Sequence, residues 1–227
     1  MSSAWHRQPR HAAFREYDTD TLRCGTQPRR AWIPAYVGIP ELRRSFAGWY
    51  RKWYGVELDP NTEIQPLIGS KEGILHVTLA FVNPGEQVLV PNPGYPTYTS
   101  LSKILGAEVI NYNLKEENGW MPDFDELEKM DMSRVKLMWT NYPNMPTGAN
   151  ATPELYRKLV DFARRKDIVI VNDNPYSFIL NEHPLSILSV PGAKECCIEF
   201  NSMSKSTICQ AGASACSPPM PTSSNGY

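Results

Sequence analysis

The sequence lacks an excess of charge of either sign and lacks any long apolar run. Its formal net charge is -1, which gives no electrostatic reason to expect nucleic acid or an acidic membrane surface as a partner. No apolar run approaches the ~20 residues of a membrane span, and the first residues lack the apolar stretch of a secretory signal. We therefore expect a cytoplasmic protein that acts on small molecules.

The cysteines form no recognisable framework. No CxxC pair is present, and the number of cysteines is odd, at Cys24, Cys196, Cys197, Cys209 and Cys216. This pattern favours neither a disulfide scaffold nor a structural zinc site. We expect thiols in a reducing compartment, and no metal.

The chain has enough residues for one large domain, but its two ends lack regular patterning. It contains 227 residues, of which 41% are hydrophobic, so folding is not limited by size. Residues 1–35 are rich in Arg, Pro and His, and residues 207–227 are small, polar and rich in Pro and Ser. We expect both ends to be unstructured and residues 36–206 to form the folded part.

Within the folded part, short β-rich runs alternate with helical stretches. Pro40 opens a helix whose aromatic stripe is expected in a core or an interface. Further helices are expected at 71–81, YTSLSKIL, FDELEKM and PELYRKLVDFARRK, and strands at QVLVP, EVINYNL, VKLMWTN, IVIVN and CCIEFN. This alternation predicts an α/β fold with three layers, α/β/α, around a mainly parallel sheet.

Four segments with unusual chemistry lie at or just after the ends of these strands. They are PNPGYPTY, NYPNMPTGAN, DNPY and NSMSKS. Each alone is typical of a turn or a helix cap. The carboxyl ends of parallel strands, however, are where such sheets bind ligands.

Taken together, the segments contain what one chemistry needs. A lysine amine can attack an aldehyde cofactor, a carboxylate can keep a pyridine ring protonated, and a phenol and an amide can hold a ring oxygen. An aromatic ring can stack on the cofactor, and the amides of a helix start can hold a phosphate.

The same segments resemble the class I/II aminotransferases of pyridoxal-phosphate (PLP) fold type I. The resemblance rests on GIPELR, IGSKEGI, NPGYPTY, NYPNMPTG, DNPY and NSMSK, in the family's order and spacing. It implies transfer of an amino group from an amino acid to a 2-oxo acid, in a homodimer. Another fold type I enzyme, such as a carbon-sulfur lyase or an aminocyclopropane-carboxylate synthase, shares these motifs, and a non-catalytic interaction module is a further alternative.

The resemblance also implies roles for individual residues. Lys205 would carry PLP as a Schiff base and move the proton at the substrate α-carbon. Asp173 would pair with the pyridinium nitrogen, and Tyr176 would donate to the ring oxygen. The other cofactor-binding residues implied are Tyr95 for ring stacking, Asn144 for the ring oxygen, and Ser70, Lys71 and Ser202 for the phosphate.

Some positions depart from the family pattern. Met145 stands where the family has Asn immediately before PTG, and Asn144 stands one position earlier. Ala213 stands where the family has the Arg that grips the phosphate. The family also continues into a C-terminal domain with the Arg that binds the substrate carboxylate, and this chain ends before it.

A shifted reading frame would account for the departures at the ends. Codons that encode Ser206 to Ala213 can be read, with one restored nucleotide, as SHNMSGWR, which is the family's own continuation. The segments before Tyr36 allow a similar reading. We therefore expect residues 36–206 to be in frame between two scrambled ends, and the fragment itself to be inactive.

Overall fold

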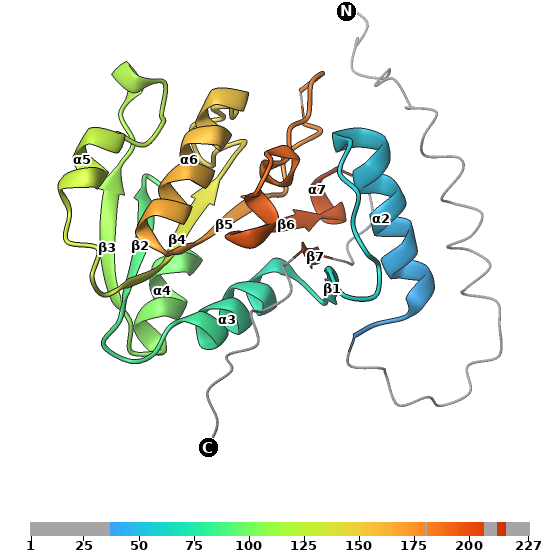
Figure 1. The fold of residues 1–227 in the computed structure, drawn as a ribbon, viewed down its shortest axis with the longest axis horizontal. Coiled ribbons are helices and arrows are strands. Elements are labelled where there is room, and N and C mark those ends of the chain that lie inside the picture. The colour runs from blue at the N-terminus through green and yellow to red at the C-terminus, as the bar shows by residue number, and fades with distance from the viewer. Residues whose placement is uncertain (1–36, 180, 207–212, 217–227) are drawn as a thin grey trace, which may run out of the picture. The chain divides into compact units, whose positions relative to one another are not determined.

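The computed structural model describes residues 37–179, 181–206 and 213–216, all within one compact unit. Their strands form one seven-stranded sheet in the order β1-β7-β6-β5-β4-β2-β3 (Figure 1). Strand β7 is antiparallel to both of its neighbours, and the pairs among the other strands are parallel. The strands are β1 Ile64–Leu67, β2 Gln87–Asn92, β3 Glu108–Asn113, β4 Val135–Asn141, β5 Val169–Asn174, β6 Cys197–Ser202 and β7 Ala213–Cys216.

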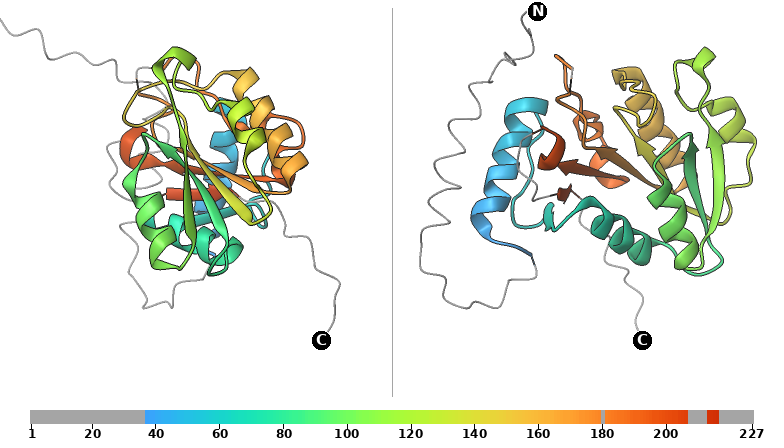
Figure 2. Two further views of the ribbon diagram at one scale, coloured as in Figure 1. Left: turned by 90° about the vertical axis from the view of Figure 1, so that its left-hand side faces the viewer. Right: turned by 180° about the vertical axis from the view of Figure 1, so that it is seen from behind.

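Helices cover both faces of the sheet and complete the three layers (Figures 1 and 2). Helices α3 and α4 pack on one face, and α2, α5 and α6 pack on the other. No helix of the described residues is long and apolar enough to cross a membrane. The helices are α2 Pro40–Tyr54, α3 Ser70–Phe81, α4 Pro96–Ile104, α5 Phe124–Lys129, α6 Pro153–Lys166 and α7 Met203–Ser206, with short 3-10 turns at Glu116–Asn118, Ile187–Ser189 and Ala193–Glu195.

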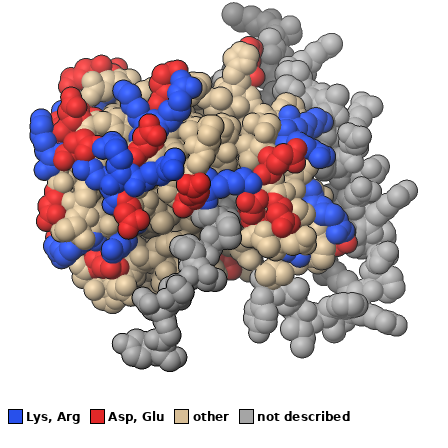
Figure 3. All heavy atoms as spheres, in the orientation of Figure 1, with Lys and Arg blue, Asp and Glu red and all other residues tan. Residues whose placement is uncertain are grey.

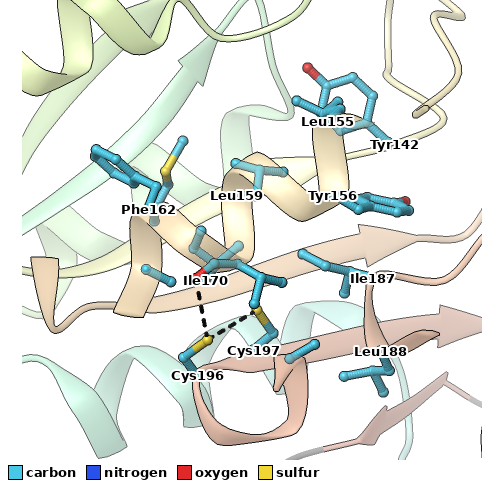
Figure 4. Close-up of a cluster of buried hydrophobic side chains, with 14 of the residues drawn as sticks. Tyr142, Leu155, Tyr156, Leu159, Phe162, Ile170, Ile187, Leu188, Cys196 and Cys197 are labelled. Atoms are coloured by element: carbon cyan, nitrogen blue, oxygen red, sulfur yellow. Dashed lines mark hydrogen bonds between the residues drawn. The ribbon is translucent and has the colours of Figure 1, made fainter. Parts of the chain in front are cut away.

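The alternation of side chains along each strand divides the buried residues into two clusters. On β4, Leu137 and Trp139 face α3 and α4, whereas Met138 faces the opposite layer. Figure 4 shows part of the cluster on the side of α2, α5 and α6. In it, the Sγ atoms of the free, buried Cys196 and Cys197 lie 3.8 Å apart. Both strand faces are therefore apolar in the centre of the sheet, as parallel strands require.

Local signals set where α6 begins and ends. The Thr152 hydroxyl accepts a hydrogen bond from the Leu155 N–H, and Pro153 opens the helix. Arg165 and Lys166 lie in its last turn, where their positive charges interact favourably with the negative end of the helix dipole. Both also contact the Glu128 carboxylate, at 2.6 Å and 2.7 Å. Figure 3 shows basic and acidic side chains intermixed over the face in view.

The predicted fold class is confirmed, and the structure adds two strands. Strand β1 was not predicted, and residues 213–216, expected in an unstructured tail, form β7 between β1 and β6. This part of the expectation for the tail is wrong, because backbone pairing with two strands requires no particular side chain. The rest of that tail and the expected N-terminal segment lie outside the described residues.

Candidate active site

The carboxyl ends of the central parallel strands lie side by side. Asn141 at the end of β4 is in register with Asp173 of β5, and Asn174 of β5 is in register with Asn201 of β6. The Asn141 amide donates to the Asp173 carbonyl oxygen at 2.7 Å. Side chains from distant segments of the sequence therefore meet at one edge of the sheet.

Asp173 is a buried carboxylate with one oxygen paired and one open. Its exposed fraction is 5%, and its Oδ2 accepts a hydrogen bond of 2.7 Å from the Tyr98 hydroxyl. Its Oδ1 is buried and has no hydrogen-bond partner among the described residues. Burial raises the pKa of this carboxyl to about 6, against the lowering effect of the Tyr98 hydrogen bond.

Two further tyrosines lie near this carboxylate. Burial, then the negative charge of Asp173, and then the neighbouring Tyr95 raise the pKa of Tyr176. Tyr95 immediately precedes α4, which begins at Pro96, and its ring makes an edge contact with Tyr98 at 5.6 Å between centroids. The structure therefore brings Asp173, Tyr95 and Tyr176 close to one another.

The loop after β4 places Met145 next to Tyr176. The Tyr176 hydroxyl lies 3.5 Å from the Met145 Sδ atom. Asn144 is buried, and its Oδ1 accepts from the Thr147 hydroxyl at 2.8 Å. The Asn144 Nδ2 has no partner among the described residues. The structure thus joins Met145 to the tyrosine, and holds the Asn144 oxygen within its own loop.

The expected phosphate-binding residues lie on α3 and β6. Ser70 and Lys71 form the first turn of α3, whose N-cap residue Gly69 makes no side-chain cap, so this helix start offers backbone N–H groups. Ser202 ends β6 and is buried. Lys205 follows within the short helix α7, with an exposed side chain. Among the described residues, no hydrogen bond or ion pair joins Ser70 or Lys71 to Asp173.

Two tyrosines without a predicted role also belong to this region. Tyr98 contacts Asp173 directly, and the signal was its position three residues after Tyr95, which favours the same face of a helix. The Tyr54 hydroxyl donates to the Ser177 Oγ at 2.9 Å and accepts from the Asn201 Nδ2 at 3.3 Å. Tyr54 therefore connects α2 to the residues next to Tyr176 and Ser202.

A comparison of the sequence with models of known protein families shows to which family the chain belongs. The model of the aminotransferase class I and II family matches residues 5–221. The chain belongs to this family. The predicted resemblance is thus confirmed, and the class I and II aminotransferases depend on PLP.

Curated relatives in this family share nearly half of their aligned residues with the chain. An LL-diaminopimelate aminotransferase of Aquifex aeolicus is 49% identical over 180 residues, covering 78% of this chain and 46% of the relative. One from Dehalococcoides mccartyi is 43% identical over 189 residues, covering 82% and 49%. The chain therefore spans about half the length of the curated relatives that it matches.

Several solved structures share the fold. Substrate-bound BacF of Bacillus subtilis matches with a TM-score of 0.82 at 36% identity, covering 88% of this chain and 52% of that one. The aromatic aminotransferase of Pyrococcus horikoshii matches with a TM-score of 0.80 at 29% identity, covering 91% and 55%. Each match therefore covers about half of the solved chain.

The described residues fit a PLP group. The open, buried Oδ1 of Asp173 is an acceptor that a protonated ring nitrogen would satisfy, and a buried acceptor without a partner is otherwise costly. The uncapped start of α3 is suited to a phosphate. Among the described residues, no group of His, Cys, Asp or Glu is arranged to hold a metal ion.

Proposed function

We propose that this chain is the cofactor-binding part of a PLP-dependent aminotransferase, which moves an amino group from an amino acid to a 2-oxo acid. The observation that carries the proposal is the buried Asp173 carboxylate, whose Oδ1 is open next to Tyr95 and Tyr176. Lys205 follows the adjacent strand β6. An acidic group at a ring-binding site and an amine one strand away are the two groups that this chemistry needs.

The proposed roles follow from position and chemical type. Bound PLP supplies an electron sink that stabilises negative charge at the substrate α-carbon. The Lys205 amine holds the cofactor aldehyde and, once released, moves the proton at that carbon. The Asp173 carboxylate keeps the ring nitrogen protonated, and Tyr95 packs on the ring face.

The remaining proposed contacts orient the cofactor. Tyr176 donates to the ring oxygen, and the Asn144 Nδ2 is the amide available in the neighbouring loop. Charge-assisted hydrogen bonds from a helix start and a hydroxyl hold a phosphate well. The residues proposed for the phosphate are Ser70, Lys71 and Ser202.

The relatives support a narrower proposal about the substrate and the assembly. Since LL-diaminopimelate aminotransferases are 49% and 43% identical to the chain, we propose LL-diaminopimelate as the amino donor of the full-length enzyme. We further propose a cytoplasmic homodimer. The relatives extend well beyond the matched half, so turnover is expected to require residues outside these 227.

The test is covalent capture of the cofactor. The purified chain is mixed with PLP and reduced with borohydride, and the modified lysine is mapped by mass spectrometry. We expect modification at Lys205 and its loss in Lys205→Ala. The control is Lys103→Ala, which removes an exposed lysine on α4 and should leave the modification of Lys205 unchanged. Modification spread evenly over the surface lysines would contradict the proposal. If Lys205 is labelled, an absorbance change on adding LL-diaminopimelate tests the donor.

A further inference from the structure

We infer that Tyr98 is a positioning residue for the cofactor ring, because it holds Asp173 by one oxygen and leaves the other oxygen directed to the site. The inference rests on the proposed function, since it concerns how Asp173 meets the ring nitrogen. Tyr98 would touch neither cofactor nor substrate. It would act through Asp173.

Packing fixes the Tyr98 ring in place. Its side chain has no exposed surface, within the cluster between α4 and the sheet. The ring stacks on Trp139 of β4, with centroids 4.8 Å apart and planes at 5°. Tyr95 contacts it from the side. Because these contacts leave the ring little freedom, the direction of its hydroxyl is set before any ligand binds.

The hydroxyl then fixes the carboxylate. A phenol has one O–H to donate, and the 2.7 Å distance to Asp173 Oδ2 is that of a good hydrogen bond. A carboxylate held at one oxygen cannot turn freely about its last torsion. Its other oxygen, Oδ1, is the one without a partner. The bond therefore selects which oxygen is available to a ring nitrogen.

The same bond favours the ionised form of Asp173 against its burial. Burial raises the pKa of this carboxyl to about 6, and the Tyr98 bond acts in the lowering direction. Burial, followed by the charge of Asp173, raises the pKa of Tyr98 itself, so this phenol stays protonated and remains a donor. Among the described residues, the Tyr176 phenol after β5 also interacts with the Asp173 charge, and the Tyr95 phenol before α4 lies near both Tyr98 and Tyr176. Strand β4 contributes the neutral Asn141 amide.

The expected consequence of losing this hydrogen bond is a change in how PLP affinity depends on pH. In Tyr98→Phe the ring packing remains and the donor is lost, so Asp173 should hold its proton to a higher pH. A protonated carboxyl cannot pair with a protonated ring nitrogen. We expect PLP affinity to fall about tenfold or more at neutral pH, which matches the loss of a hydrogen bond to a charged group, and to fall further as the pH is lowered.

The experiment measures the carboxyl directly, without and with cofactor. Asp173 is titrated by carbon-13 NMR in the cofactor-free chain labelled at aspartate carboxyls, and assigned with Asp173→Asn. PLP affinity is then measured across the same pH range. The matched control is Tyr112→Phe, which removes another buried hydroxyl, one that donates to the Trp139 carbonyl oxygen at 2.7 Å. Tyr98→His, which restores a ring donor, tests rescue.

The outcomes separate this inference from the proposed function. A higher Asp173 midpoint in Tyr98→Phe, but not in Tyr112→Phe, supports the inference, as does a return towards the wild-type value in Tyr98→His. Equal midpoints in Tyr98→Phe and the wild type overturn it, even if the chain binds PLP. If the wild type binds no PLP, the proposed function fails, and the titration alone still decides whether Tyr98 controls Asp173. If Tyr98→Phe does not fold, Tyr98→His must reproduce the wild-type midpoint or the inference fails.

Discussion

Gly73 sets how closely α3 approaches the sheet at the candidate site. A Cβ atom at this position would lie 2.6 Å from the Leu67 Cδ1 and 2.9 Å from the Phe200 Cζ. Phe200 is fully buried on β6, two residues before Ser202. The missing side chain therefore allows the first turn of α3, with Ser70, to lie against the strand that leads to Lys205.

We predict that Gly73→Ala destabilises the chain. Overpacking a core position costs about 1–3 kcal/mol, and because the fully buried Phe200 cannot move away we expect a cost above the gain of about 1 kcal/mol from replacing a helical glycine by alanine. Urea unfolding followed by circular dichroism measures the difference. The control is Gly48→Ala in α2, where a Cβ atom would meet nothing within 4 Å, so that only the stabilising helical contribution remains. A Gly73→Ala chain more stable than the wild type would disprove close packing.

At the scale of elements, β7 places position 213 at the candidate phosphate site. In the β6–β7 register Ala213 is opposite Ser202, and in the β1–β7 register it is opposite Leu67. Ser202 is a proposed phosphate contact, and the family pattern has Arg at the position of Ala213. The strand pairing thus brings the two positions together, although ten residues lie between them in the sequence.

We predict that Ala213→Arg strengthens PLP binding. A guanidinium next to Ser202 could form two charge-assisted hydrogen bonds to the phosphate, which would increase affinity by about tenfold or more. Fluorescence titration with PLP measures the affinity of the variant and of the wild type. Ala215→Arg, which is opposite Phe200 and Gln65 instead, is the control on the same strand. Equal gains from both variants would mean that the added charge acts without regard to register.

The elements also show what could be predicted from the sequence. Strands β2, β4 and β5 contain the apolar runs VLV, LMW and VIV, so their buried, parallel arrangement follows from composition. Strand β1 has four residues of which one is buried, and β7 consists of Ala, Ser and Cys. Such strands have no periodic signal, because their pairing comes from the neighbouring backbones. The Tyr98–Asp173 contact likewise depends on how α4 packs over the sheet, which a motif does not contain.

At the scale of the whole molecule, two buried carboxylates on opposite faces of the sheet, Glu199 and Asp173, have different surroundings. Glu199 is fully buried on the α2 and α6 side, where it accepts from Tyr50, Ser186 and the Ile187 N–H. Burial nevertheless raises its pKa. Asp173 has one donor to its carboxylate, Tyr98, among the described residues, and an open oxygen. The first carboxylate is satisfied by the protein, whereas the second is available for a ligand.

This difference predicts how stability depends on pH. The pKa of Asp173 is raised from 3.8 to about 6 in the folded chain, so the folded state binds a proton more tightly than the unfolded state does. The unfolding free energy contributed by this group is then highest at or below about pH 4, falls as the pH rises to about 6, and is constant above that value. Asp173→Asn removes this dependence. Because Glu199 is present in both chains, its own contribution cancels in the comparison.

The measurement is urea unfolding of the wild type and Asp173→Asn without cofactor. Between about pH 4.5 and about pH 7.5, the wild type should lose about 2 kcal/mol relative to the variant. Excess PLP should offset this relative loss at the higher pH, since a ligand that binds the ionised carboxylate stabilises the wild type more than the variant. Parallel pH profiles for the two chains would show that Asp173 titrates as an ordinary exposed carboxyl. A site with an open, buried acceptor at neutral pH would then be ruled out.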